Sequence, residues 1–245
     1  MTTTSEGTPE QGADRERQVR RIFSEIAPRY DLLNHLLSLN IDRRWRRQAV
    51  DRLEWRERPD GTYLDACAGT YDLALELTGR QGFSGSVVAS DFAHPMLVQG
   101  LPKLEDAPVQ PVSSDSLRLP FPDAAFDGAM VAFGVRNLAD HEAGFHESAR
   151  VLKPGARLVI LEFSTPPNTV LRPLYLFYFH RVLPRIGRII SGHPWAYTYL
   201  PESVRHFPGP ERMADQLRDH GFEPVTWEYL TVGIAAIHVG VRAGS

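Results

Sequence analysis

The apolar residues of the first part of the chain recur at the spacing of amphipathic helices. One stripe precedes Pro28, a leucine-rich stripe follows it over residues 32–37, and a third helical piece surrounds Trp45. We therefore expect N-terminal helices over residues 15–58. Residues 1–14 are polar and have almost nothing to bury, so this segment is expected to be disordered.

From Thr62 the pattern changes to short apolar runs that alternate with helical stretches. The strands are expected at residues 62–66, 86–91, 109–114, 126–134 and 156–164, and the helices between them at 72–80, 94–101 and 141–152. Such alternation is typical of a parallel sheet with crossover helices. After a helix at 213–222, strands at 224–231 and 233–242 form a hairpin. The pattern thus predicts one α/β domain over residues 15–245, with a mostly parallel seven-stranded sheet and an antiparallel terminal strand.

Composition excludes several classes of protein. The formal net charge of −3 and the pI near 6.3 argue against a general nucleic-acid binder, and we expect no nucleic-acid partner. The single cysteine, Cys67, leaves no intrachain disulfide. The polar N-terminus is unlike a secretory signal, and no apolar stretch reaches the length of a membrane span. The expected location is the cytoplasm.

A glycine after the first predicted strand and an aspartate at the end of the second indicate a site for a nucleoside. Gly69 follows the first predicted strand, where a ligand can approach backbone that carries no side chain, and Thr70 can cap the next helix. Asp91 ends the second strand, 22 residues after Gly69, where a carboxylate can accept both hydroxyls of a ribose. A capped helix alone would explain either feature, but the two together favour a nucleoside cofactor.

The loop after the first strand favours S-adenosylmethionine over a dinucleotide. It lacks the full glycine fingerprint that a pyrophosphate needs, whereas S-adenosylmethionine has no phosphate. At the end of the third strand, Asp115 and Ser116 are candidates for the adenine amino group, beside the apolar side chains Phe92 and Leu117. Taken alone, the Asp-Ser pair is common loop chemistry.

Longer motifs make the interpretation specific. They read IFSEIAPRYDLLNHLLSLNIDRRWRR, LPFPDAAFDGAMVAFGVRN, ARVLKPGARLVILEFSTP and HRVLPRIGRIISGHPWAYTYLPESVRHFP. From about Val19 to Val239 the chain closely resembles the ubiquinone/menaquinone biosynthesis C-methyltransferase family. The resemblance implies the class I S-adenosylmethionine-dependent methyltransferase fold and methyl transfer to a ring carbon of a demethylated, prenylated quinol. It also implies cofactor contacts at Thr70, Asp91, Asp115, Ser116 and the backbone of Ala132, beside Gly69.

The chain departs from the family at Tyr71, where Gly-Thr-Gly-Asp is usual. A tyrosine there requires a changed backbone, or it lays its ring beside the cofactor pocket. This leaves open a non-catalytic scaffold protein of quinone biosynthesis as an alternative. A second alternative is a methyltransferase for another small molecule.

The transfer needs a nucleophilic ring, and therefore help with loss of the quinol proton. Arg136 and Asn137 in FGVRN are the catalytic candidates; Arg136 stays protonated, so electrostatic stabilisation suits it better than a role as base. Tyr30, His180 and His193 are alternatives. Because the sulfonium is already activated, no metal is expected.

The segment LRPLYLFYFHRVLPRIGRII combines aromatic and aliphatic residues with arginines. We expect residues 165–210 to form a substrate lid over a prenyl chain. Peripheral contact with the inner face of the membrane and an ordinary core insertion are alternatives. The resemblance implies demethylmenaquinol as the acceptor, with the benzoquinol of the ubiquinone pathway as a further candidate, and a homodimer is a further expectation left open.

Overall fold

The computed structural model describes residues 19, 21, 24, 25, 27, 40–178, 181 and 202–244. Several predictions fall outside this part of the chain. They are the N-terminal segment 1–14, most of the first two N-terminal helices, the candidates Tyr30, His180 and His193, and the centre of the expected lid.

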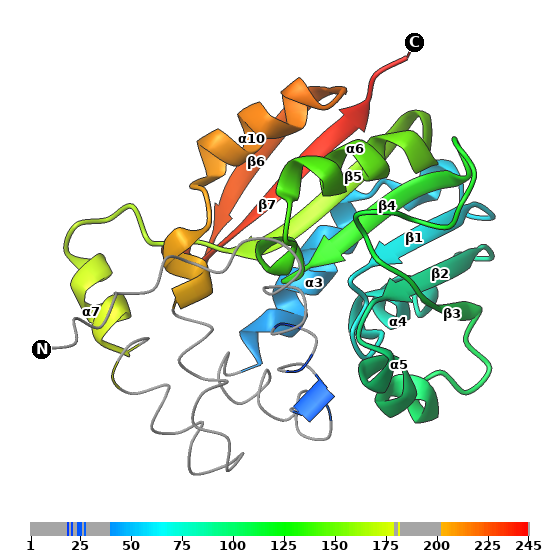
Figure 1. The fold of residues 1–245 in the computed structure, drawn as a ribbon, viewed down its shortest axis with the longest axis horizontal. Coiled ribbons are helices and arrows are strands. Elements are labelled where there is room, and N and C mark those ends of the chain that lie inside the picture. The colour runs from blue at the N-terminus through cyan, green and yellow to red at the C-terminus, as the bar shows by residue number, and fades with distance from the viewer. Residues whose placement is uncertain are drawn as a thin grey trace, which may run out of the picture.

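Seven strands form one sheet in the order β3-β2-β1-β4-β5-β7-β6 (Figure 1). Their bounds are β1 Thr62–Ala66, β2 Ser86–Asp91, β3 Val109–Ser113, β4 Phe126–Ala132, β5 Leu152–Phe163, β6 Phe222–Leu230 and β7 Ala235–Arg242. The first five strands pair in parallel, and β7 runs antiparallel to both β5 and β6. The predicted fold is therefore confirmed.

Helices cover both faces of the sheet. They are α3 Ile41–Arg52, α4 Asp72–Thr78, α5 His94–Gly100, α6 His141–Val151 and α10 Pro210–Asp219, whereas α7 Leu171–Phe177 lies apart from the sheet (Figure 1). Alternate residues of β1, β2, β4 and β5 enter two separate cores, as the pleat requires. Tyr63 of β1 packs with α3 and α4, whereas its neighbour Leu64 packs with α6 and α10.

One strand boundary differs from the prediction. We expected the fifth strand at residues 156–164, after a turn at Lys153-Pro154-Gly155, but β5 already begins at Leu152. Phe126 of β4 pairs with Leu152 and Gly128 pairs with Arg157, so the register shifts across the turn. Gly155 has φ 79°, which suits glycine in the bulging segment.

The two edge strands each contain a proline. Pro111 lies in β3, and Pro224 lies in β6 where the pairing with β7 is interrupted between Phe222 and Val225. Proline lacks the N–H group that a ladder needs, so it is accommodated at edges and bulges. Among the helices in the described ranges, none has the length and apolar character to cross a membrane.

Candidate functional site

A cavity opens at the carboxyl ends of β1, β2 and β4, where parallel α/β sheets bind their ligands. Its empty space of about 410 Å³ includes the open solvent at its mouth. Its lining residues are Cys67, Gly69, Asp91, Phe92, Met96, Ala132, Phe133, Gly134, Asn137 and Leu138. Four predicted site residues, Gly69, Asp91, Ala132 and Asn137, therefore line one cavity.

Asp91 is held by the backbone on both sides. Its Oδ2 accepts a hydrogen bond from Gly69 N at 2.8 Å, and its Oδ1 accepts one from Ala93 N at 2.7 Å. The side chain is buried, and this burial raises the pKa of the carboxyl against the effect of the two hydrogen bonds. Each oxygen keeps a further lone pair for a ligand.

A second buried carboxyl lies below the same loop. Asp65 in β1 is 1% exposed, and its Oδ2 accepts a hydrogen bond from Ala74 N at 3.0 Å. Burial raises the pKa of Asp65 to about 8, and the negative charge of Asp91 adds to this effect. Within the described ranges, neither Asp65 nor Asp91 forms an ion pair.

Thr70 and Tyr71 turn away from the cavity. Thr70 Oγ1 accepts a hydrogen bond from Lys103 Nζ at 3.1 Å, and Tyr71 Oη donates to the Leu97 carbonyl at 2.7 Å. Tyr71 has φ 71° and a fully buried side chain. Of the two outcomes expected for a tyrosine here, the structure has the unusual backbone, and the ring is not among the cavity's lining residues.

The adenine candidates lie on the next strand end. Asp115 lines a second hollow with Ser113 and Ser114, and Phe92 belongs to both hollows. Ser116 does not line the cavity itself, but its Oγ lies 3.4 Å from Sγ of Cys67, which does. These two residues thus flank the cavity from β3.

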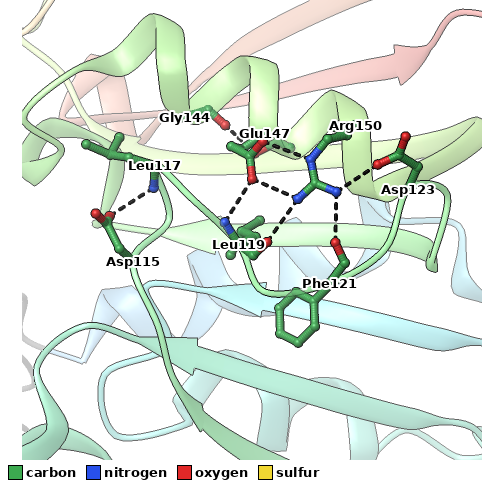
Figure 2. A network of polar contacts seen from close by, with 9 residues as sticks. Asp115, Leu117, Leu119, Phe121, Asp123, Gly144, Glu147 and Arg150 are labelled. Carbon is green, nitrogen blue, oxygen red and sulfur yellow. Dashed lines mark hydrogen bonds and ion pairs between the residues drawn. The ribbon is translucent and has the colours of Figure 1, made fainter.

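Polar contacts from α6 fix the loop that carries these residues (Figure 2). Asp115 Oδ1 accepts a hydrogen bond from Leu117 N at 2.9 Å. Glu147 Oε2 accepts one from Leu119 N at 2.8 Å, and Arg150 donates to the Leu119 carbonyl at 2.9 Å. The ion pairs of Arg150 with Glu147 and with Asp123 raise its pKa, so it stays charged.

The turn after β4 is built around one carbonyl. Phe133 has φ 58°, and its oxygen accepts hydrogen bonds from Arg136 Nη1 at 2.5 Å and from Asn137 Nδ2 at 3.2 Å. Arg136 is 6% exposed, and its Nη1 forms an ion pair with Glu162 Oε1 at 2.6 Å. Glu162 also accepts from Arg136 N at 3.2 Å. Arg136 therefore braces the turn, whereas Asn137 lines the cavity.

The positive charge of Arg136 acts on Tyr175 of helix α7. Burial raises the pKa of the Tyr175 phenol, and the positive charge of Arg136 acts in the opposite direction. The described part of the expected lid therefore brings one phenol near this guanidinium. No group of three or more His, Cys, Asp or Glu residues that could hold a metal occurs within the described ranges.

Sequence reasoning missed several residues of the site. Met96, Phe133 and Leu138 line the cavity but carry no motif chemistry, because apolar residues at such positions look like ordinary core. Glu162 was missed as well. It lies inside the strongly apolar run of β5, and a buried charge within such a run was the available signal.

Comparison with known proteins places the chain among methyltransferases. Residues 11–242 match the model of the ubiE/COQ5 methyltransferase family. The chain is 51% identical to a demethylmenaquinone methyltransferase of Thermus thermophilus, over 90% of this chain and 100% of that protein. It is 45% identical to the demethylmenaquinone methyltransferase of Deinococcus radiodurans, over 97% and 98% of the two chains. It is 43% identical to the ubiquinone/menaquinone biosynthesis C-methyltransferase UbiE of Geobacter sulfurreducens, over 94% and 90%.

Solved structures share the fold at low sequence identity. The [4+2]-cyclase SpnF has a TM-score of 0.71 at 15% identity, over 98% of this chain and 99% of that one. Phosphoethanolamine N-methyltransferase 2 of Haemonchus contortus, solved in complex with S-adenosyl-L-methionine, has a TM-score of 0.59 at 14% identity, over 80% and 52%. Because one fold serves both a cyclase and a methyltransferase, the fold alone does not define the reaction.

Proposed function

The chain belongs to the ubiE/COQ5 methyltransferase family, and from this premise we propose that it methylates a ring carbon of prenylated demethylmenaquinol. Relatives at 40–51% identity are named methyltransferases of menaquinone and ubiquinone biosynthesis. The protein is accordingly an S-adenosylmethionine-dependent methyltransferase of quinone biosynthesis. The choice of acceptor follows the two relatives at 51% and 45% identity, both named for demethylmenaquinone.

The charges of the cavity suit this cofactor. Asp91 lines the cavity and Asp65 is buried behind it; neither forms an ion pair in the described part of the chain, and a cationic ligand would favour the ionised form of each. When bound, S-adenosylmethionine supplies a methyl group on a positively charged sulfur. Asp91 would hold the ribose, and the backbone of Gly69 and Ala132 would border the ligand. Asp115, Ser116 and Phe92 would receive the adenine.

Thr70 has a different role in this proposal from the one implied by the family. Its hydroxyl is engaged by Lys103 Nζ and does not line the cavity. We therefore assign to Thr70 the shape of the loop, and to Gly69 the direct approach to the ligand.

The acceptor would lie between Asn137 and helix α7. A quinol hydroxyl there meets a positive potential from Arg136, as the phenol of Tyr175 does. Such a potential lowers the pKa of a phenol and so favours the phenolate, whose ortho carbon is the nucleophile. Asn137 would orient the hydroxyl from the cavity wall, while Arg136 stays paired with Glu162.

Helix α7 supports contact of the protein with the membrane that holds the prenyl tail. Val170, Leu174 and Phe177 are 80%, 68% and 60% exposed, and their spacing places them on one side of the helix. Apolar residues in such numbers on one helix side are typical of interfacial binding. Co-sedimentation with phosphatidylglycerol vesicles is expected for the unmodified protein and lost in Leu174→Ser/Phe177→Ser, whereas unchanged binding would contradict the membrane contact.

Calorimetric titration with S-adenosylmethionine, followed by a methyl-transfer assay on demethylmenaquinol, tests the proposed function. We expect micromolar binding that is lost in Asp91→Ala. In Asn137→Ala we expect kcat to fall by about 10²-fold, as for removal of one stabilising donor, with cofactor affinity nearly unchanged. Cofactor binding without transfer to demethylmenaquinol, but with transfer to a demethylated benzoquinol, would overturn the choice of acceptor.

A further inference from the structure

The segment from Asp91 to Lys103, which includes helix α5 and the 3₁₀ turn Leu101–Lys103, contacts the cofactor loop at several of its residues. Asp91 precedes the helix and binds Gly69 N. The Leu97 carbonyl accepts a hydrogen bond from Tyr71 Oη at 2.7 Å. Gly100 lies so close that an added Cβ would be 2.6 Å from the Tyr71 ring and 2.9 Å from Thr70 Cα. Each loop residue thus meets a partner from this one segment.

Lys103 supplies the last of these contacts and connects two loop residues. Its Nζ donates to Thr70 Oγ1 at 3.1 Å and to Asp72 Oδ1 at 2.7 Å. Asp72 begins α4, and its second oxygen lies 3.4 Å from Arg46 Nη2 of α3. A charge-assisted hydrogen bond of this length is among the stronger polar contacts in proteins. The lysine therefore fixes Thr70 and Asp72 relative to α5.

We propose that Lys103 is a positioning residue for the cofactor, acting through the loop Gly69–Asp72. The loop has positive φ at both Gly69 and Tyr71, 56° and 71°. Such backbone persists where surrounding contacts hold it, and Lys103 is one of those contacts. Gly69 is bonded directly to Thr70 and lines the cavity. Loss of the Lys103 contacts therefore displaces the backbone that the ligand contacts. The inference rests on the proposed function, because it concerns the affinity of the same cavity for its cofactor.

The test compares the two lysines of the chain. Lys103→Met removes the contacts with the loop. Lys153→Met is the matched control, because Lys153 also binds a carboxylate, Asp127 Oδ1 at 2.8 Å, but at the amino-terminal ends of β4 and β5. Lys103→Arg keeps the charge and serves as the conservative variant. For each, the dissociation constant of S-adenosylhomocysteine is measured by calorimetry, the melting temperature by thermal unfolding, and KM and kcat for S-adenosylmethionine by steady-state kinetics.

We expect Lys103→Met to weaken S-adenosylhomocysteine binding about 10-fold, the effect of losing one good polar contact. KM for S-adenosylmethionine rises in parallel, with kcat at saturation unchanged. Lys103→Arg retains most of the affinity for S-adenosylhomocysteine, and Lys153→Met binds it as the unmodified protein does. Should Lys103→Met fail to fold, Lys103→Gln removes the charge but keeps a donor, with the same expected direction.

Unchanged affinity in folded Lys103→Met or Lys103→Gln overturns the inference, even if the melting temperature falls, because lower stability alone is a purely structural effect. Absence of binding in the unmodified protein overturns the proposed function instead. The two failures are therefore distinguishable in one experiment.

Discussion

The two walls of the cavity place their buried charges differently. The wall after β1 and β2 contains Asp91 and has the buried Asp65 behind it, and the described hydrogen-bond partners of both are backbone N–H groups. The wall after β4 is fixed by Glu162, whose carboxylate is paired with Arg136 at 2.6 Å. Buried carboxyls shape both walls, but among the described residues only the carboxylate of Glu162 forms an ion pair with a cationic side chain. A cationic ligand should therefore stabilise the ionised carboxyls of the first wall, whereas the carboxylate of the second wall already has a cationic partner.

Replacing the unpaired carboxyl should give the largest effect. Asp65 has a folded pKa raised to about 8 from 3.8, so between these pH values the folded state binds a proton that the unfolded state has released. The contribution of Asp65 to stability is therefore expected to fall as pH rises from about 4 to about 8. In Asp65→Asn this dependence disappears, a difference of up to about 1.4 kcal/mol per pH unit.

Urea unfolding at pH 5, 6.5 and 8 measures the effect of Asp65→Asn. Asp219→Asn, at an exposed position, is the control and should follow the unmodified protein. Parallel curves for Asp65→Asn and the unmodified protein would show that Asp65 titrates alike in both states. Saturating S-adenosylmethionine should reduce the pH dependence of the unmodified protein, since a cation favours ionised Asp65.

Removing the carboxylate that pairs with Arg136 should give the next largest effect. Glu162→Ala leaves Arg136 buried without its carboxylate, and loss of one partner of a buried pair costs about 3–5 kcal/mol. Glu228→Ala removes the partner of Arg52 in an exposed pair at 2.6 Å, where the cost is about 0–1 kcal/mol. Chemical denaturation of both variants gives the comparison. Equal costs would mean that burial of the Arg136 pair adds nothing.

The smallest effect concerns the packing of Tyr71 against α5. Gly100→Ala places a methyl group 2.6 Å from the Tyr71 ring, and overpacking of this kind costs about 1–3 kcal/mol. In a Tyr71→Ala background the same substitution should cost less, because the contact with the ring is gone and only the contact with Thr70 Cα at 2.9 Å remains. Unfolding free energies of the four proteins test this. Equal cost in both backgrounds would assign the strain to the Thr70 backbone instead.

Much of the fold could be predicted from local patterns. The bounds of β1 and β2 coincide with the predicted strands, because buried parallel strands are continuous apolar runs. The start of β5 could not be predicted, since Lys153-Pro154-Gly155 is turn chemistry that here lies within a register shift. Nothing local in the sequence records that shift.

The site was predicted in its positions more than in its contacts. Gly69, Asp91, Ala132 and Asn137 line the cavity, as expected for the ends of parallel strands. Their roles toward the cofactor and the acceptor stay predictions. The orientations of the Thr70 and Arg136 side chains could not be predicted from the neighbouring sequence. Their partners Lys103 and Glu162 lie 33 and 26 residues away along the chain.

The prolines at the two ends of the sheet limit how copies of the chain can associate. Pro111 in β3 and Pro224 in β6 interrupt the row of donors that an incoming strand would need. Growth of the sheet by edge-to-edge pairing, the common first step of aggregation and of strand exchange between protomers, is therefore disfavoured. A homodimer, which stays a prediction, would have to form through helices or loops, and its interface would leave the strand order of each subunit intact.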